Sequence, residues 1–146
     1  MSEPIPVERL WLLTTSQLSS LVHEMIRKAV GCELGIVDTE LGDDFRKKYL
    51  TRLYVIDRIY GYSFVVDVYY RPNHLVVDLV RSNERRRPEE YVKLVEIFKA
   101  TFPPAPADSS TTSLAVGTFE TGPDTHRGGY VVAVHVLQLL KAHEMI

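Results

Sequence analysis

Two hydrophobic runs separated by a short turn constrain the fold of this chain most. Residues 63–70 are rich in valine and aromatic residues, residues 74–80 are rich in valine, and these residue types favour strands. Pro72 and Asn73 lie between the runs and are typical of a tight turn. The pattern predicts a β-hairpin with a two-residue loop, in which residue 71 lies opposite 74, residue 69 opposite 76 and residue 67 opposite 78.

This register places two aspartates opposite each other. Asp67 and Asp78 then share one face of the sheet, where like charges in a cross-strand pair are destabilising. Arg52 and Arg58, on a strand predicted over residues 49–60, fall on the same face. We therefore expect the two arginines to neutralise the aspartates as a cross-strand network.

A metal site is the alternative explanation for the aspartate pair. A divalent cation held by Asp67 and Asp78 would remove the repulsion and activate water, as in a metal-dependent phosphodiesterase or nuclease. Nuclease sites that place acids on adjacent strands also need a lysine two residues after the second acid, and this chain has Val80 there. The sequence therefore favours ion pairs, leaves the two aspartates as its only metal candidates, and predicts no cofactor.

The flanking segments predict helices. Apolar residues recur at helical spacing over residues 18–29, and Thr14 and Gln17 have the spacing of a capping box. A second helix is expected after Pro88 and before the prolines that begin at position 103.

The C-terminal third leaves one choice open. Residues 114–120 and residues 130–136 predict two more strands, followed by a short terminal helix over residues 137–145. The valine-rich stretch from residue 130 fits one buried helix as well. The expected fold is a two-layer α+β domain with an antiparallel sheet: helix, β-meander, helix, two strands and a short terminal helix.

Length and composition predict one soluble domain over residues 1–146, with a flexible connection rich in proline, serine and threonine at about 103–112. The net charge of -2 gives no general attraction to nucleic acid or to an anionic membrane. No apolar run approaches the roughly 20 residues that span a bilayer. A single cysteine, Cys32, excludes an intrachain disulfide and fits a reducing, cytoplasmic location.

Other chemical candidates are weak. The acidic segment 38–44 lacks the alternating acids of a calcium loop, and the basic run 85–87 is flanked by glutamates. His126, beside Gly128 and Gly129 in a predicted surface loop, has no identifiable catalytic partner. Nothing in the sequence therefore assembles a nucleophilic active site, and the sequence favours a non-enzymatic protein.

The polar face of the predicted sheet is the candidate functional surface. It mixes arginines and tyrosines with branched apolar side chains: Arg52, Tyr54, Ile56, Arg58, Val65, Tyr69, Arg71 and Val76. Such mixtures are typical of protein interfaces and are unfavourable when left in water. The leading hypothesis is a non-enzymatic interaction module (an adaptor, a chaperone-like protein or an assembly subunit) that acts as a dimer or with another protein. Stacking of bases on Tyr54 and Tyr69 gives a further alternative, the binding of single-stranded nucleic acid.

Overall fold

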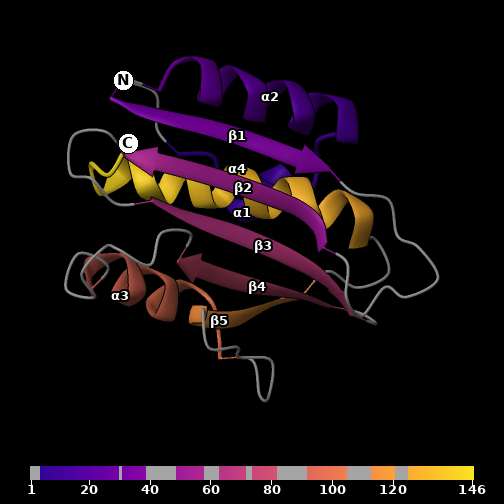
Figure 1. Ribbon diagram of the computed structural model, residues 1–146. Helices are drawn as coiled ribbons and strands as arrows, with labels where there is room; N and C mark the ends of the chain where they lie inside the picture. Colours follow the sequence, from indigo (N-terminus) through magenta and orange to yellow (C-terminus); the bar gives the residue numbers. More distant parts are fainter. Residues whose placement is uncertain are drawn as a thin grey trace.

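The computed structural model describes residues 4–29, 31–38, 49–57, 63–71, 74–81, 92–104, 113–120 and 125–146. Four helices and five strands occur in these residues (Figure 1). In chain order they are α1 (Val7–Leu10), α2 (Thr15–Arg27), β1 (Cys32–Asp38), β2 (Tyr49–Asp57), β3 (Ser63–Arg71), β4 (His74–Arg81), α3 (Val92–Thr101), β5 (Ser113–Glu120) and α4 (Thr125–Ala142).

The strands form one antiparallel sheet in the order β1-β2-β3-β4-β5, which confirms the predicted α+β class and its β-meander. The predicted hairpin register is also confirmed, because Arg71 pairs with His74, Tyr69 with Val76, and Asp67 with Asp78. The register follows from the short turn, since a two-residue loop fixes which residues lie opposite each other.

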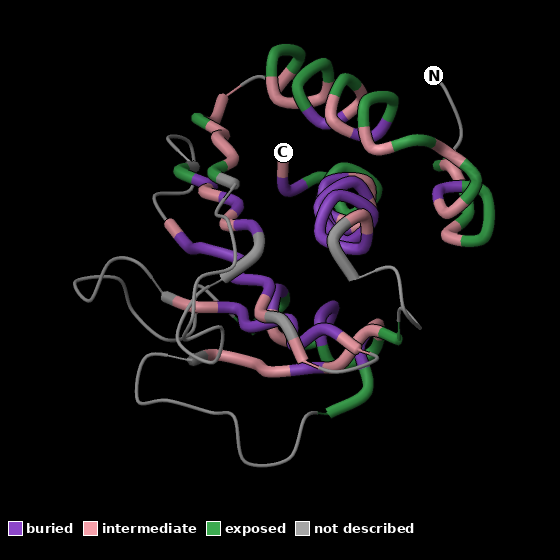
Figure 2. The backbone as a smooth tube through the Cα atoms, turned by 90° about the vertical axis from the view of Figure 1, so that its right-hand side faces the viewer, coloured by how far each residue is buried: buried purple, intermediate pink, exposed green. Residues whose placement is uncertain are grey.

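The helices lie on one side of the sheet (Figure 2). The long helix α4 packs against β2, β3 and β4, α3 packs against β5, and α2 packs on α4 and on β1. None of the described helices covers the other side, which is turned to the viewer in Figure 1. We call this other side the open face, after its lack of a covering helix.

The core lies between the sheet and α4. Alternate residues of the strands, including Val55, Phe64, Val66, Val77 and Leu79, point to the helical side and are at most 2% exposed. They meet a nearly continuous run of buried residues on α4, from Tyr130 to Val134 and again at Val136, Leu137 and Leu140. Burial of one face per strand explains why the strand residues alternate in polarity.

The predicted start of α2 is confirmed in detail. Thr14 caps the helix by accepting a hydrogen bond from the backbone of Gln17, and the Gln17 side chain accepts one from the backbone of Thr14. This capping box satisfies two backbone donors that the first turn cannot pair internally. Leu18 and Val22, which the predicted stripe contains, are fully buried.

The predicted strand over residues 130–136 is wrong. These residues belong to α4, which begins at Thr125, so the alternative of one buried helix is confirmed. The predicted surface loop is also wrong from residue 125 onward, because Gly128 and Gly129 are buried in the first turns of the helix. A helix that is buried on nearly all sides has no polar stripe, so its sequence lacks the helical period.

Of the predicted connection at 103–112, only Pro103 and Pro104 lie within the described residues. Within the described residues, no helix is both long and apolar enough to cross a membrane.

Candidate interaction surface

The aspartate pair lies in the middle of the open face. Asp67 on β3 is 2% exposed and Asp78 on β4 is 5% exposed, so both carboxyl groups are buried in the sheet surface. Burial of two facing carboxyl groups is costly unless cations or hydrogen-bond donors lie close to them.

Arg52 supplies such a cation. It lies directly opposite Asp67 on β2, and its guanidinium forms a two-point ion pair, with Nε 2.6 Å from Oδ1 and Nη2 2.9 Å from Oδ2. The predicted neutralisation of Asp67 by Arg52 is therefore confirmed. Arg58, the second predicted cation, lies outside the described residues.

Tyr69 completes the network around Asp67. Its hydroxyl donates a hydrogen bond of 3.3 Å to Asp67 Oδ2. Burial, with the charges of Asp67 and Asp78, raises the pKa of Tyr69 to about 12. The hydroxyl therefore remains protonated at neutral pH and acts as a donor, not as a base.

This geometry favours the ion-pair hypothesis over the metal hypothesis. Both carboxylate oxygens of Asp67 bind the Arg52 guanidinium, so a cation would have to displace a two-point ion pair. In the part of the chain that the structure describes, no three histidine, cysteine or acidic side chains are grouped so as to hold a metal ion.

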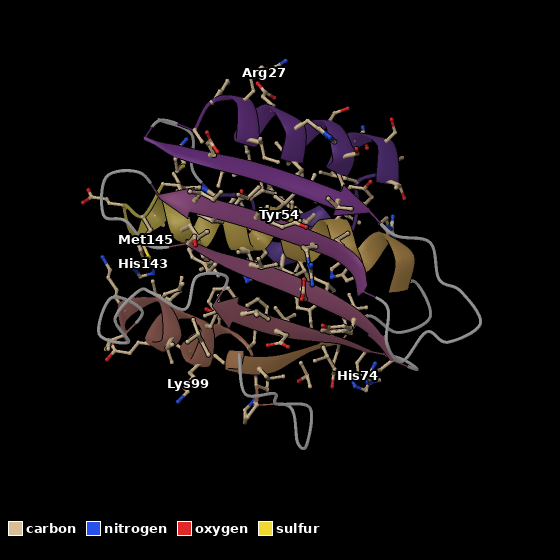
Figure 3. All side chains as sticks on the ribbon, in the orientation of Figure 1. Arg27, Tyr54, His74, Lys99, His143 and Met145 are labelled. Carbon is tan, nitrogen blue, oxygen red and sulfur yellow. The ribbon has the colours of Figure 1, made fainter. Side chains whose placement is uncertain are left out.

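The predicted surface residues differ widely in exposure. Ile56 is 46% exposed, the Arg52 side chain is 31% exposed, and Tyr54, Tyr69 and Arg71 are partly buried. Tyr54 lies on β2 in the middle of the sheet, whereas His74 marks the far end of β4 (Figure 3).

Two of the predicted surface residues offer little surface to a partner. Val65 and Val76 lie on the open face but are only 6% and 1% exposed. The exposed apolar part of this face is therefore at the end formed by β1 and β2.

Sequence reasoning missed the contribution of β1. Val37 is 40% exposed and lies opposite Arg52, Gly35 lies opposite Tyr54, and Glu33 lies opposite Ile56. The alternation of these residues with Leu34 and Ile36 is the sequence signal for this contribution. We call the residues Val37, Arg52, Tyr54 and Ile56 the β1–β2 patch.

The remaining candidates do not join the aspartate pair. His23 is exposed on α2, with Nδ1 2.7 Å from the carbonyl oxygen of Ser19. His135 lies on α4, behind the sheet. Its ring contacts the Phe102 ring edge-on, with 6.0 Å between the two ring centroids. Burial lowers the pKa of His135 below its usual value. Cys32 is partly buried at the start of β1.

Several candidates fall where the structure is not described. The side chain of His126, the acidic residues 39–44 and the basic run 85–87 lie outside the described residues. The backbone of His126 belongs to the first turn of α4.

Comparison with known proteins adds no relative: no family model, no curated protein and no solved structure matches this chain. The function therefore has to be argued from the geometry.

Proposed function

We propose that this chain is a protein-interaction module that assembles through the β1–β2 patch. The observation that carries the proposal is the exposure of Val37 and Ile56, at 40% and 46%, on a sheet face that no described helix covers. Exposed apolar side chains gathered beside a tyrosine and an arginine have the composition of interface centres.

Protein is favoured over nucleic acid as the partner. The Arg52 guanidinium is already held by Asp67, and the Tyr69 hydroxyl is bound to the same carboxylate. A surface that binds single strands needs cations for phosphates and accessible rings for bases. With a net charge of -2, the chain as a whole does not attract phosphates.

The partner tested first is a second copy of the chain. Static light scattering over a concentration series is expected to give a mass above 16.7 kDa, the mass of one chain. Ile56→Lys should return the mass to that of one chain, because a lysine in the patch would have to be desolvated on assembly.

Val92→Lys is the matched control, since Val92 is 53% exposed on α3, away from the patch. A single mass of 16.7 kDa at every concentration would contradict assembly through this face. Equal loss of association in both variants would also contradict it. Tight binding of labelled single-stranded oligonucleotides at high salt would instead favour the nucleic-acid alternative.

The proposal includes an intracellular, reducing location, which rests on the single cysteine Cys32 in the sequence.

A further inference from the structure

Arg52 contacts both a buried carboxylate and an aromatic ring of the β1–β2 patch. Asp67 binds its guanidinium at two points, and Arg52 Cζ lies 6.0 Å from the centroid of the Tyr54 ring, the distance of a cation–π contact. The ion pair fixes the guanidinium, because Nε and Nη2 are both held by the carboxylate. The guanidinium is thereby kept over the ring of Tyr54, which Figure 3 labels in the middle of the sheet.

The Tyr54 ring receives no side-chain support from the residue opposite it on β1. That residue is Gly35, and nothing lies within 4 Å of a Cβ built on it. Arg52 is two residues away from Tyr54 on the same face of β2. The contact with Arg52 is therefore an important support for the ring.

Asp67 acts on the patch from beneath its surface. Asp67 is 2% exposed, whereas the Arg52 side chain is 31% exposed. A partner on the open face can touch the arginine and the tyrosine, while the carboxylate is covered. An effect of Asp67 on assembly therefore has to pass through Arg52, which makes Asp67 a positioning residue.

We propose that Asp67 enables the β1–β2 patch to bind the same patch of a second copy, by neutralising Arg52 and holding it over Tyr54. The inference rests on the proposed function and names the residue that controls it. In a two-fold interface a surface meets itself, so Arg52 of each copy enters the same small contact area. Two guanidinium groups would repel each other there and would be costly to desolvate, and a carboxylate bound to each before assembly lowers both costs.

The same charges favour a second copy as the occupant. With Asp67 bound to Arg52, the patch presents an aromatic ring, a neutralised arginine and the exposed apolar side chains of Val37 and Ile56. A strongly acidic or strongly basic partner would gain little from such a surface. A second copy offers the matching composition of apolar side chains and paired charge.

The test compares two substitutions of a carboxylate by an amide. Asp67→Asn keeps the size of the side chain and removes the charge that faces Arg52. Glu24→Gln is the matched control, because it removes the same charge from the ion pair with Lys28 on α2, on the helical side of the sheet. Self-association of the full chain is measured by static light scattering over a concentration series, at low and at high salt.

Asp67→Asn should weaken self-association at least about threefold at low salt, the loss expected from an exposed cation–π contact and from added repulsion. High salt should recover part of this loss, because it screens the repulsion between the two guanidinium groups. The wild type and Glu24→Gln should associate equally strongly and respond little to salt. A purely structural defect in Asp67→Asn would instead weaken association equally at both salt concentrations.

A second variant tests the role of charge independently of the stability of Asp67→Asn. Asp67→Asn combined with Arg52→Gln removes both charges, so its self-association should not depend on salt. Association of Asp67→Asn equal to that of the wild type, or a loss of the same size at both salt concentrations, would overturn the inference.

The proposed function is tested separately in the same series. If Ile56→Lys dissociates and Asp67→Asn does not, the patch assembles as proposed and the role of Asp67 is overturned. A wild-type mass of 16.7 kDa at every concentration would contradict the proposed function itself, and this inference with it.

Discussion

The outer strands β1 and β5 occupy equivalent positions at opposite edges of one sheet, yet the chain finishes them in different ways. At β5 the segment after α3 returns along the edge and forms a bridge at Gly117. At β1 no further described strand follows, while the helical layer continues with α2. The bridge ties the edge strand β5 to the segment after α3 and so contributes to stability, and the described residues show no equivalent bridge at β1.

Glycine has a different role at the two edges. A Cβ on Gly117 would meet Cβ of Phe102 and the carbonyl oxygens of Phe102 and Pro103, so the close approach of this segment requires glycine. A Cβ on Gly35 would meet open space. The first glycine therefore serves packing, and the second makes no comparable close contact.

The largest expected loss of stability comes from the buried network around Asp67, which lies between the two edges of the sheet. Arg52→Leu should lower the free energy of unfolding by about 3 kcal/mol, because it leaves the buried carboxylate of Asp67 without its cation. Urea denaturation measures this loss. Combining it with Asp67→Asn should recover most of the stability, and an unchanged loss in the double variant would mean that Arg52 acts through packing alone.

The glycine comparison gives the next largest effect. Gly117→Ala should lower the free energy of unfolding by about 2 kcal/mol, because the new methyl group overpacks the bridge to β5. Gly35→Ala is the matched control and should change it by less than about 0.5 kcal/mol. Similar losses at both positions, again from urea denaturation, would remove the distinction between the two edges.

Acid is expected to destabilise the protein through His135, which lies on the β5 side of the molecule. Because burial lowers the pKa of His135, the unfolded chain binds a proton more readily than the folded chain. The stability contributed by the neutral ring is present above the ordinary value of 6.5 and is lost as the pH falls below it.

The loss of stability on acidification should be smaller than the loss caused by Arg52→Leu or by Gly117→Ala. The melting temperature of the wild type is compared with that of His135→Gln at about pH 7 and at about pH 5. Equal acid sensitivity in the two proteins would assign the effect to other groups.

The sequence predicts the centre of this fold better than its borders. The turn predicted at Pro72 and Asn73 gives the register that the structure shows for β3 and β4, with Asp67 opposite Asp78. The face on which Arg52 lies can also be predicted, because residues two apart in a strand point to the same face of the sheet. These features depend on local geometry, which a single sequence contains.

The features that were missed depend on tertiary contacts. The helix α4 is buried along most of its length, so its valines carry no helical period that would distinguish it from a strand. The burial of Val65 and Val76 depends on tertiary packing at the open face. The alternation of polar and apolar residues along a strand does not specify that packing. The position of β1 beside β2 likewise follows from assembly of the whole sheet.

Hydrogen exchange at the two edges tests the central claim most directly. In the chain alone, the Thr118 amide should exchange slowly, because it donates to Pro103 across the edge of β5. Among Leu34, Gly35, Ile36 and Val37, the amides that point outward from β1 should exchange much faster, because no described strand pairs with that edge. If the outward amides of β1 exchange as slowly as that of Thr118, the account of the two edges is contradicted.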